Sequence, residues 1–171
     1  MKSINSIHEA LINRGKIFTK KEIMDLFERY KKVNPSISHK SLVADLSKNK
    51  YIKRIFLGYY YVNSYDERKR GYSEYSNKEL VFWVLNKEKI KWYLGFNTAI
   101  YEQGKTWQTP NKINIINTRI SGERRVVGLN IKFIKIKENL VFGVKESKTK
   151  NNISYFYSDP AKTYIDEVYF K

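Results

Sequence analysis

The sequence predicts an α+β fold, with helices and a β-hairpin in the N-terminal part and a mixture of helices and strands in a small C-terminal part. Apolar residues recur at helical spacing from Ile4 to Leu46, and two β-rich runs then flank Leu57-Gly58. Of the 171 residues, 42% are hydrophobic and 15% are aromatic. The chain therefore has enough apolar material for one domain or two small ones.

Two helices and a short strand are expected first. The first helix ends at Gly15, and its apolar face is formed by Ile4, Ile7, Leu11 and Ile12. The pair Ile17-Phe18 predicts a short strand. Thr19, with Glu22 three residues later, has the capping-box pattern and begins a second helix. The apolar face of this helix carries Ile23, Leu26, Phe27 and Tyr30.

A third helix and a hairpin follow. Ser38 is expected to cap the third helix, whose buried face carries Leu42, Val43 and Leu46. Residues 51–62 read as a hairpin that turns at Leu57-Gly58. The order of three helices and a hairpin is typical of a winged helix-turn-helix, which we predict for residues 1–63.

The rest of the chain is expected to form a linker and a second domain. Residues 64–76 are polar and charged without apolar periodicity, so we predict a linker there. Residues 77–171 are predicted to be an α+β domain. Its expected helices cover 78–85, 92–103 and the segment that begins at Asp159-Pro160. Its expected strands cover 112–117, 130–136 and 140–144. The last two of these strands are expected to pair with each other.

The charge of the chain points to an anionic partner. Lys and Arg number 33 against 17 Asp and Glu, a net charge of +16. Such a surplus favours nucleic acid, an acidic protein or an anionic membrane surface as the partner, although Lys-rich composition is also typical of AT-rich genomes. No apolar stretch reaches the ~20 residues of a membrane span, no signal peptide is visible and Cys is absent. We therefore expect a soluble, cytoplasmic protein that does not bind membranes.

The predicted helix-turn-helix defines candidate DNA contacts. The third helix of this motif enters the major groove, the wing lies along phosphates or in the minor groove, and helix N-termini bind phosphate. Each of these side chains could also be an ordinary solvated residue. The prediction therefore depends on the whole arrangement, in which the hairpin directly follows the third helix. The candidates are Lys20, Lys21, Ser38, His39, Lys40, Ser41, Ala44, Lys48, Lys53, Arg54 and Tyr59.

Catalytic patterns are sparse. His8, expected at the surface or half-buried, and His39 are isolated, so we expect no metal, no cofactor and no enzymatic activity. Glu146-Ser147-Lys148 superficially fits the last carboxylate and Lys of a metal-dependent nuclease. Because the triplet lies in a Lys- and Asn-rich stretch, we interpret it as a solvated loop and keep a nuclease, or another nucleic-acid-processing protein, as the alternative function. The three tryptophans, Trp83, Trp92 and Trp107, are expected in the core or at a domain interface.

Several motifs resemble the AbiEi-type family of antitoxins and transcriptional regulators, which belongs to type IV toxin-antitoxin (abortive infection) systems. The resemblance extends from roughly Ile7 to Phe170. It depends on Ile17-Phe18-Thr19, Gly58-Tyr59-Tyr60, Trp92-Tyr93-Leu94-Gly95 with Thr98-Ala99 and Tyr101, Gly104, Gln108-Thr109-Pro110-Asn111-Lys112-Ile113, and Asp159-Pro160-Ala161-Lys162-Thr163 with Asp166.

The resemblance implies a sequence-specific DNA-binding repressor of the antitoxin type. Such a protein regulates its own operon through the winged helix, and its C-terminal domain opposes a cognate nucleotidyltransferase-like toxin. A stand-alone regulator of the same architecture is equally consistent with the motifs. Since one winged helix has a small footprint, we expect double-stranded DNA with repeated or inverted half-sites to bind two copies of a protein that is a monomer in solution.

Overall fold

The structure, a computed structural model, describes residues 2–31 and 39–170. The chain divides into two compact units, Met1–Ser76 (unit 1) and Asn77–Lys171 (unit 2). Each unit combines helices with a β-sheet, which confirms the predicted α+β class. Within the described residues, no helix is both long enough and apolar enough to cross a membrane.

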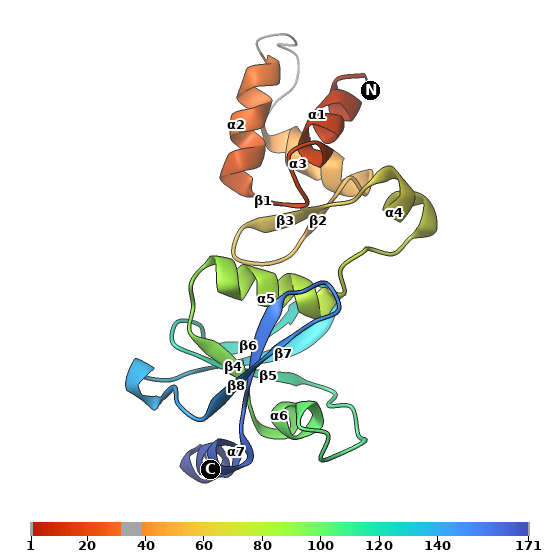
Figure 1. Cartoon of the computed structure of the whole chain (residues 1–171). Coiled ribbons are helices and arrows are strands. Elements are labelled where there is room, and N and C mark those ends of the chain that lie inside the picture. Colours follow the sequence, from red (N-terminus) through yellow and green to blue (C-terminus); the bar gives the residue numbers. More distant parts are fainter. Residues whose placement is uncertain (1, 32–38, 171) are drawn as a thin grey trace. The chain divides into compact units, whose positions relative to one another are not determined.

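Unit 1 places three helices on one side of a three-stranded antiparallel sheet (Figure 1). The strand order is β1-β3-β2, so β3 is central and pairs on both sides. In chain order the elements are α1 (Lys2–Ile12), β1 (Ile17–Thr19), α2 (Lys20–Lys31), α3 (His39–Lys48), β2 (Ile52–Arg54), β3 (Tyr59–Val62) and α4 (Tyr65–Arg70).

The predicted helical faces form the core of unit 1. One cluster of buried side chains joins the three helices and the sheet, and it includes Ile7, Leu11, Ile23, Leu26, Phe27, Leu42, Leu46, Ile52 and Val62. The capping box at the start of α2 is present: Thr19 N donates to Glu22 Oε2 (2.7 Å) and Glu22 N donates to Thr19 Oγ1 (3.2 Å). The cap expected at Ser38 lies outside the described residues.

The segment predicted as a linker, 64–76, contains a helix. Ser64 and Glu67 form a capping box at the start of α4, and Gly71 ends the helix in a left-handed conformation with φ 78°. No helix was expected in this segment, although the Ser-x-x-Glu spacing is itself a helix start signal. Residues 64–76 belong to unit 1.

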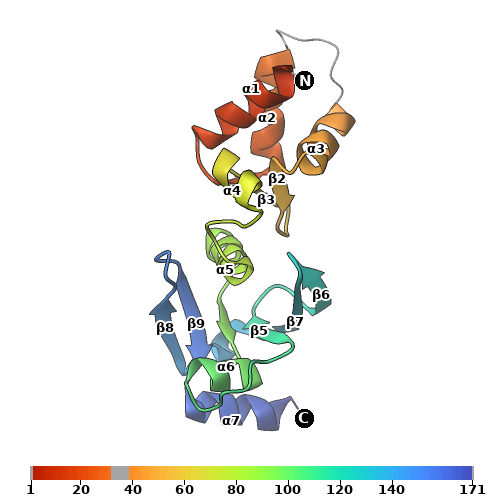
Figure 2. The ribbon, with the colours of Figure 1, turned by 90° about the vertical axis from the view of Figure 1, so that its right-hand side faces the viewer.

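Unit 2 is built on a six-stranded mixed sheet with strand order β6-β7-β5-β4-β9-β8. Helix α5 lies on one face of this sheet, and α6 and α7 lie on the other (Figures 1 and 2). The elements are α5 (Asn77–Lys87), β4 (Trp92–Leu94), α6 (Phe96–Glu102), β5 (Ile113–Asn117), β6 (Gly122–Val126), β7 (Leu129–Lys135), the 3-10 helix η1 (Glu138–Leu140), β8 (Val144–Lys148), β9 (Ser154–Ser158) and α7 (Pro160–Tyr169).

The helix expected over 92–103 is a strand followed by a shorter helix. Strand β4 is buried on both faces, since Trp92 stacks on Phe82 of α5 while the Tyr93 hydroxyl donates to Asp166 of α7 (2.9 Å). A strand buried on both faces has no polar alternation, so its sequence resembles a buried helix. Gly95 then turns the chain into α6, where a Cβ would collide with the Ile116 side chain.

Two further expectations for unit 2 were wrong. Strand β7 pairs with β5 and β6, whereas it was expected to pair with residues 140–144. The distance along the chain favoured a local hairpin across Glu138-Asn139, but those residues form η1 and continue to β8. Trp92 is buried as expected, but the Trp107 side chain is 88% exposed and belongs to no core.

The C-terminus of α5 generates a stability prediction. Lys89 has a φ of 53°, and the bonds Lys89 N to Asn86 O and Ile90 N to Leu85 O form a Schellman motif around it. A left-handed conformation costs a non-glycine residue roughly 1–2 kcal/mol. We therefore expect Lys89→Gly to raise the free energy of unfolding of unit 2 by about 1 kcal/mol.

The measurement is urea unfolding followed by Trp fluorescence, because all three tryptophans lie in unit 2. Lys87→Gly makes the same chemical change two residues earlier, inside the helix, and should destabilise by about 1 kcal/mol. Equal effects of the two substitutions would contradict the assignment of strain to Lys89.

Candidate nucleic-acid interface

Helix α3 presents its predicted outer positions to solvent. Leu42 and Leu46 are fully buried, while Ala44 and Lys48 are exposed and Ser41 is half-buried. His39 and Lys40 form the first turn of α3, and Ser38 lies outside the described residues. The 3.6-residue period that buries the leucines thus leaves Ala44 and Lys48 on a surface of the helix that a ligand can reach.

The β2–β3 hairpin places two cations beside a tight turn. Lys53 pairs with Tyr61 and Arg54 pairs with Tyr60 across the hairpin. Arg54 is exposed; Lys53 is half-buried, and this burial lowers the pKa of its ammonium group. The turn residues Leu57 and Gly58 have φ values of 51° and 80°, the two positive angles of a type I′ turn.

Tyr59 does not lie where a DNA contact requires it. Its side chain is only 6% exposed, so most of the ring is out of reach of a groove or a phosphate. The physical reason is that both faces of β3 are covered, since all four of its successive residues are buried. The expectation that Tyr59 contacts DNA is therefore corrected.

The N-terminus of α2 offers fewer free donors than predicted. Lys20 and Lys21 are exposed as expected. However, Lys20 N donates to Gly58 O of the hairpin turn (2.9 Å), and Thr19 N donates to the Glu22 carboxylate (2.7 Å). A phosphate at this end of α2 would therefore meet the two ammonium groups and, next to them, the charge of Glu22.

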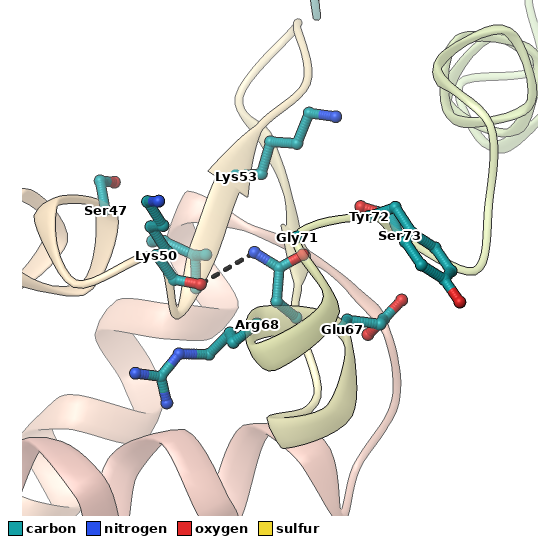
Figure 3. A pocket seen from close by; sticks show the side chains of 10 residues that line it. Ser47, Lys50, Lys53, Glu67, Arg68, Gly71, Tyr72 and Ser73 are labelled. Atoms are coloured by element: carbon teal, nitrogen blue, oxygen red, sulfur yellow. Dashed lines mark hydrogen bonds between the residues drawn. The ribbon is translucent and has the colours of Figure 1, made fainter.

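A cavity of about 370 Å³ lies beside α3, β2 and α4 (Figure 3). It brings together basic side chains that sequence reasoning did not select, Lys50 at the end of α3 and Arg68 on α4, with Lys53 of β2. Asn63 Nδ2 donates to Lys50 O (2.9 Å; dashed in Figure 3) and ties the end of β3 to the end of α3. Of these cations only Arg68 belongs to a basic run, Arg68-Lys69-Arg70, which lies in the segment that was predicted to be a linker.

Glu67, which also lines this cavity, organises the polar groups around it. Its carboxylate accepts bonds from Lys16 Nζ (2.8 Å), Ser64 N (2.6 Å), Glu74 N (2.7 Å) and the Tyr61 hydroxyl. Burial alone would raise the pKa of Glu67, but these donors outweigh it and lower the pKa to about 2. The carboxylate therefore stays charged and holds α4 against β3.

His8 is fully buried, contrary to the expectation of a surface or half-buried residue. Its Nε2 lies 2.7 Å from Asn63 O, and its ring packs 4.4 Å from the Tyr51 ring. Burial, with a further contribution from Arg68, lowers the pKa of His8 despite the bond to Asn63. His8 is thus a neutral core residue of unit 1.

The nuclease triplet does not lie in a loop. Glu146, Ser147 and Lys148 belong to β8, an edge strand, where Glu146 pairs with Phe156 of β9. The expectation of a loop was wrong because the triplet pairs with the aromatic strand β9. Among the described residues, no group of three or more acidic or histidine side chains is arranged to hold a metal ion.

Comparisons with known proteins add no family assignment. No protein-family model matches the chain, and no curated protein matches its sequence significantly. The class of protein must therefore be argued from the fold and the exposed charges.

The donor set of Glu67 predicts a pH dependence. Its pKa falls from an ordinary 4.5 to about 2 on folding, so the unfolded chain takes up the proton first as the pH decreases. The stability that Glu67 contributes is fully present above about pH 5 and is lost as the pH falls towards about 2. We expect Glu67→Gln to lower the free energy of unfolding at pH 7 by on the order of 2 kcal/mol and to flatten this pH dependence.

Far-UV circular dichroism during urea unfolding from pH 2 to 7 measures the effect, and Trp fluorescence separately reports unit 2. Asp66→Asn, at an exposed neighbour in α4, is the matched control. Parallel pH profiles for wild type and Glu67→Gln would show that the carboxylate does not have this role.

Proposed function

We propose that this protein is a DNA-binding transcriptional regulator in which unit 1 is a winged helix-turn-helix. In this proposal α3 is the recognition helix, which enters the major groove, and the β2–β3 hairpin is the wing. The observation that carries it is the element order α1-β1-α2-α3-β2-β3 with the strand order β1-β3-β2, because the hairpin directly follows the helix that would enter the major groove.

The distribution of charge supports the same proposal. The net charge of +16 favours an anionic partner, and exposed cations occur on each of the three elements that would face the duplex. They are Lys20 and Lys21 on α2, Lys48 on α3 and Arg54 on β2. Ala44 is small and exposed and leaves room for a base edge, so α3 would combine base contacts with a phosphate contact of Lys48.

The specific form of regulator that we propose comes from the AbiEi-type resemblance: a repressor of the antitoxin type that binds repeated or inverted half-sites in its own promoter. A nucleotidyltransferase-like toxin would then be the partner of its C-terminal unit. The motif residues of that unit have plain structural roles, since Thr98 Oγ1 accepts from Asn114 N and Asp159 caps α7. DNA binding is the part of the proposal that unit 1 supports directly.

The hairpin cations give the first test. We expect Lys53→Ala and Arg54→Ala each to weaken binding to promoter DNA and to random DNA by similar factors. Each should also lower the slope of log K against log salt by about one for a lost phosphate contact. Fluorescence anisotropy titrations between about 50 and 200 mM salt measure this. Lys145→Ala, at an exposed residue of β8 in unit 2, is the charge-matched control.

The helix α3 gives the second test. Lys40→Ala and Ser41→Ala should weaken binding to promoter DNA more than binding to random DNA, by about 1–3 kcal/mol for a lost base contact. A gel shift on the DNA upstream of the protein's own gene, with and without Mg²⁺, separates this proposal from the nuclease alternative. Cleavage that requires Mg²⁺ and disappears in Glu146→Ala would overturn the proposed function.

A further inference from the structure

Helix α7 buries polar side chains and exposes apolar ones, the reverse of an ordinary surface helix. Its buried face carries Lys162, Thr163 and Asp166, which are 2–4% exposed. Its outer face carries Tyr164 (70% exposed), Ile165 (46%), Val168 (59%) and Tyr169 (66%). The spacing i, i+1, i+4, i+5 gathers these four side chains on one side of the helix. We call them, together with Phe170 (38% exposed), the α7 stripe.

The buried polar contacts fix this orientation. Asp166 forms an ion pair with Lys162 (2.7 Å) and accepts a bond from the Tyr93 hydroxyl (2.9 Å). Thr163 Oγ1 is 2.7 Å from Ser158 Oγ, and Gln103 Nε2 donates to Thr163 Oγ1 (3.1 Å). Rotating the helix to bury the stripe would carry the ion pair out to solvent and leave the buried hydroxyls of Tyr93 and Ser158 without these partners, at a cost of roughly 1–3 kcal/mol each. The stripe is therefore held outwards.

The stripe is large enough to be an interface. Aromatic side chains bury about 150–250 Å² each, so the exposed parts of these five side chains amount to roughly 500 Å². A stable interface of standard size covers about 800 Å² on each partner, of which about 60% is apolar. The stripe thus matches the apolar share of such an interface, and it reaches the size of patch that marks interaction sites on monomers.

The charges beside the stripe are mostly positive. A hollow of about 840 Å³ at the end of α7 is lined by Tyr169 and Phe170 with Arg119, Lys135, Lys137 and one carboxylate, that of Glu138. A second hollow of about 460 Å³, which Phe170 also lines, has Lys132 and Glu167 as its charged residues. Unit 2 as a whole has 17 Lys and Arg against 9 Asp and Glu. We call these basic residues, Arg119, Lys132, Lys135 and Lys137, the lysine rim. An acidic partner would be attracted to the lysine rim.

We propose that the α7 stripe and its lysine rim dock another protein through an amphipathic helix that has an apolar face and carboxylates along its flanks. A second copy of this chain would bring two strongly basic units together, and nucleic acid would gain nothing from the apolar side chains. The docking surface belongs to unit 2, and it does not depend on the DNA binding proposed for unit 1.

A fluorescein-labelled model peptide tests the proposal with the full chain. The probe is a helix of about 18 residues with Leu at i, i+3, i+4 and i+7 and Glu elsewhere, and its counterpart carries Lys in place of Glu. Anisotropy should show binding of the Glu peptide and none of the Lys peptide. Ile165→Ser and Val168→Ser leave the net charge unchanged and should each weaken binding about tenfold, from lost apolar burial.

Matched variants keep the test specific. Trp107→Ser removes an exposed aromatic elsewhere in unit 2 and should leave peptide binding unchanged, while Lys135→Gln with Lys137→Gln should weaken it mainly at low salt. Circular dichroism confirms that each variant is folded. Binding of the Glu peptide that is unaffected by Ile165→Ser would overturn the proposal.

Two other results would also overturn it. The first is a concentration-dependent dimer in sedimentation velocity that Ile165→Ser abolishes, which would assign the stripe to a second copy. The second is Ile165-dependent binding to phosphatidylglycerol vesicles without binding of the Glu peptide, which would assign it to a lipid surface.

Discussion

The bonds that the Glu67 carboxylate accepts are the interactions on which the second half of unit 1 depends. A buried charge is tolerated only when donors surround it, and here the donors come from four places: Lys16 before β1, Tyr61 of β3, and the backbone amides of Ser64 and Glu74. These bonds fix α4 against the central strand. Because β3 pairs with both β1 and β2, fixing β3 also fixes the hairpin that follows α3. The presentation of the proposed DNA-binding elements thus depends on a carboxylate that would never touch DNA.

Unit 2 also contains a buried carboxylate that is surrounded by donors, but there the consequence is different. Asp166 is buried with Lys162 and Tyr93 as partners, and the buried hydroxyls of Tyr93 and Ser158 keep their partners on α7 only while its polar face points inwards. Since a helix has only one inner face, the apolar side chains such as Tyr164 and Val168 must then point outwards. A polar network in the interior therefore creates an apolar surface on the exterior. The free energy that this surface loses to solvent is recovered only if a partner covers it.

The sequence predicted unit 1 better than unit 2 for a physical reason. Helices α1 to α3 each have one buried face, so the 3.6-residue period of Leu42 and Leu46 is visible in the sequence. Strand β4 is covered on both sides, and Trp92-Tyr93-Leu94 shows no alternation that would separate it from a helix. The pairing of β5 with β7 joins residues about 18 positions apart in parallel, and nothing local specifies such a pairing. Helix α4 was predictable from the capping pattern of Ser64 and Glu67, but its charged sequence has no apolar periodicity that would mark it as a helix.

The candidate DNA contacts show the same difference between helices, whose exposed positions the sequence predicts, and strands, whose exposed positions it does not. Positions that depend on helical period, such as Ala44 and Lys48, are exposed as predicted, whereas the exposure of Tyr59 depends on what covers the two faces of the sheet, which the sequence of a hairpin alone does not determine. The two proposed surfaces also differ in their physics. Cations on unit 1 would bind DNA through phosphate contacts, while the α7 surface would combine apolar burial by the stripe with attraction of carboxylates to its lysine rim. Any influence of a protein docked on α7 on DNA binding must be matched by an equal influence of DNA on that docking.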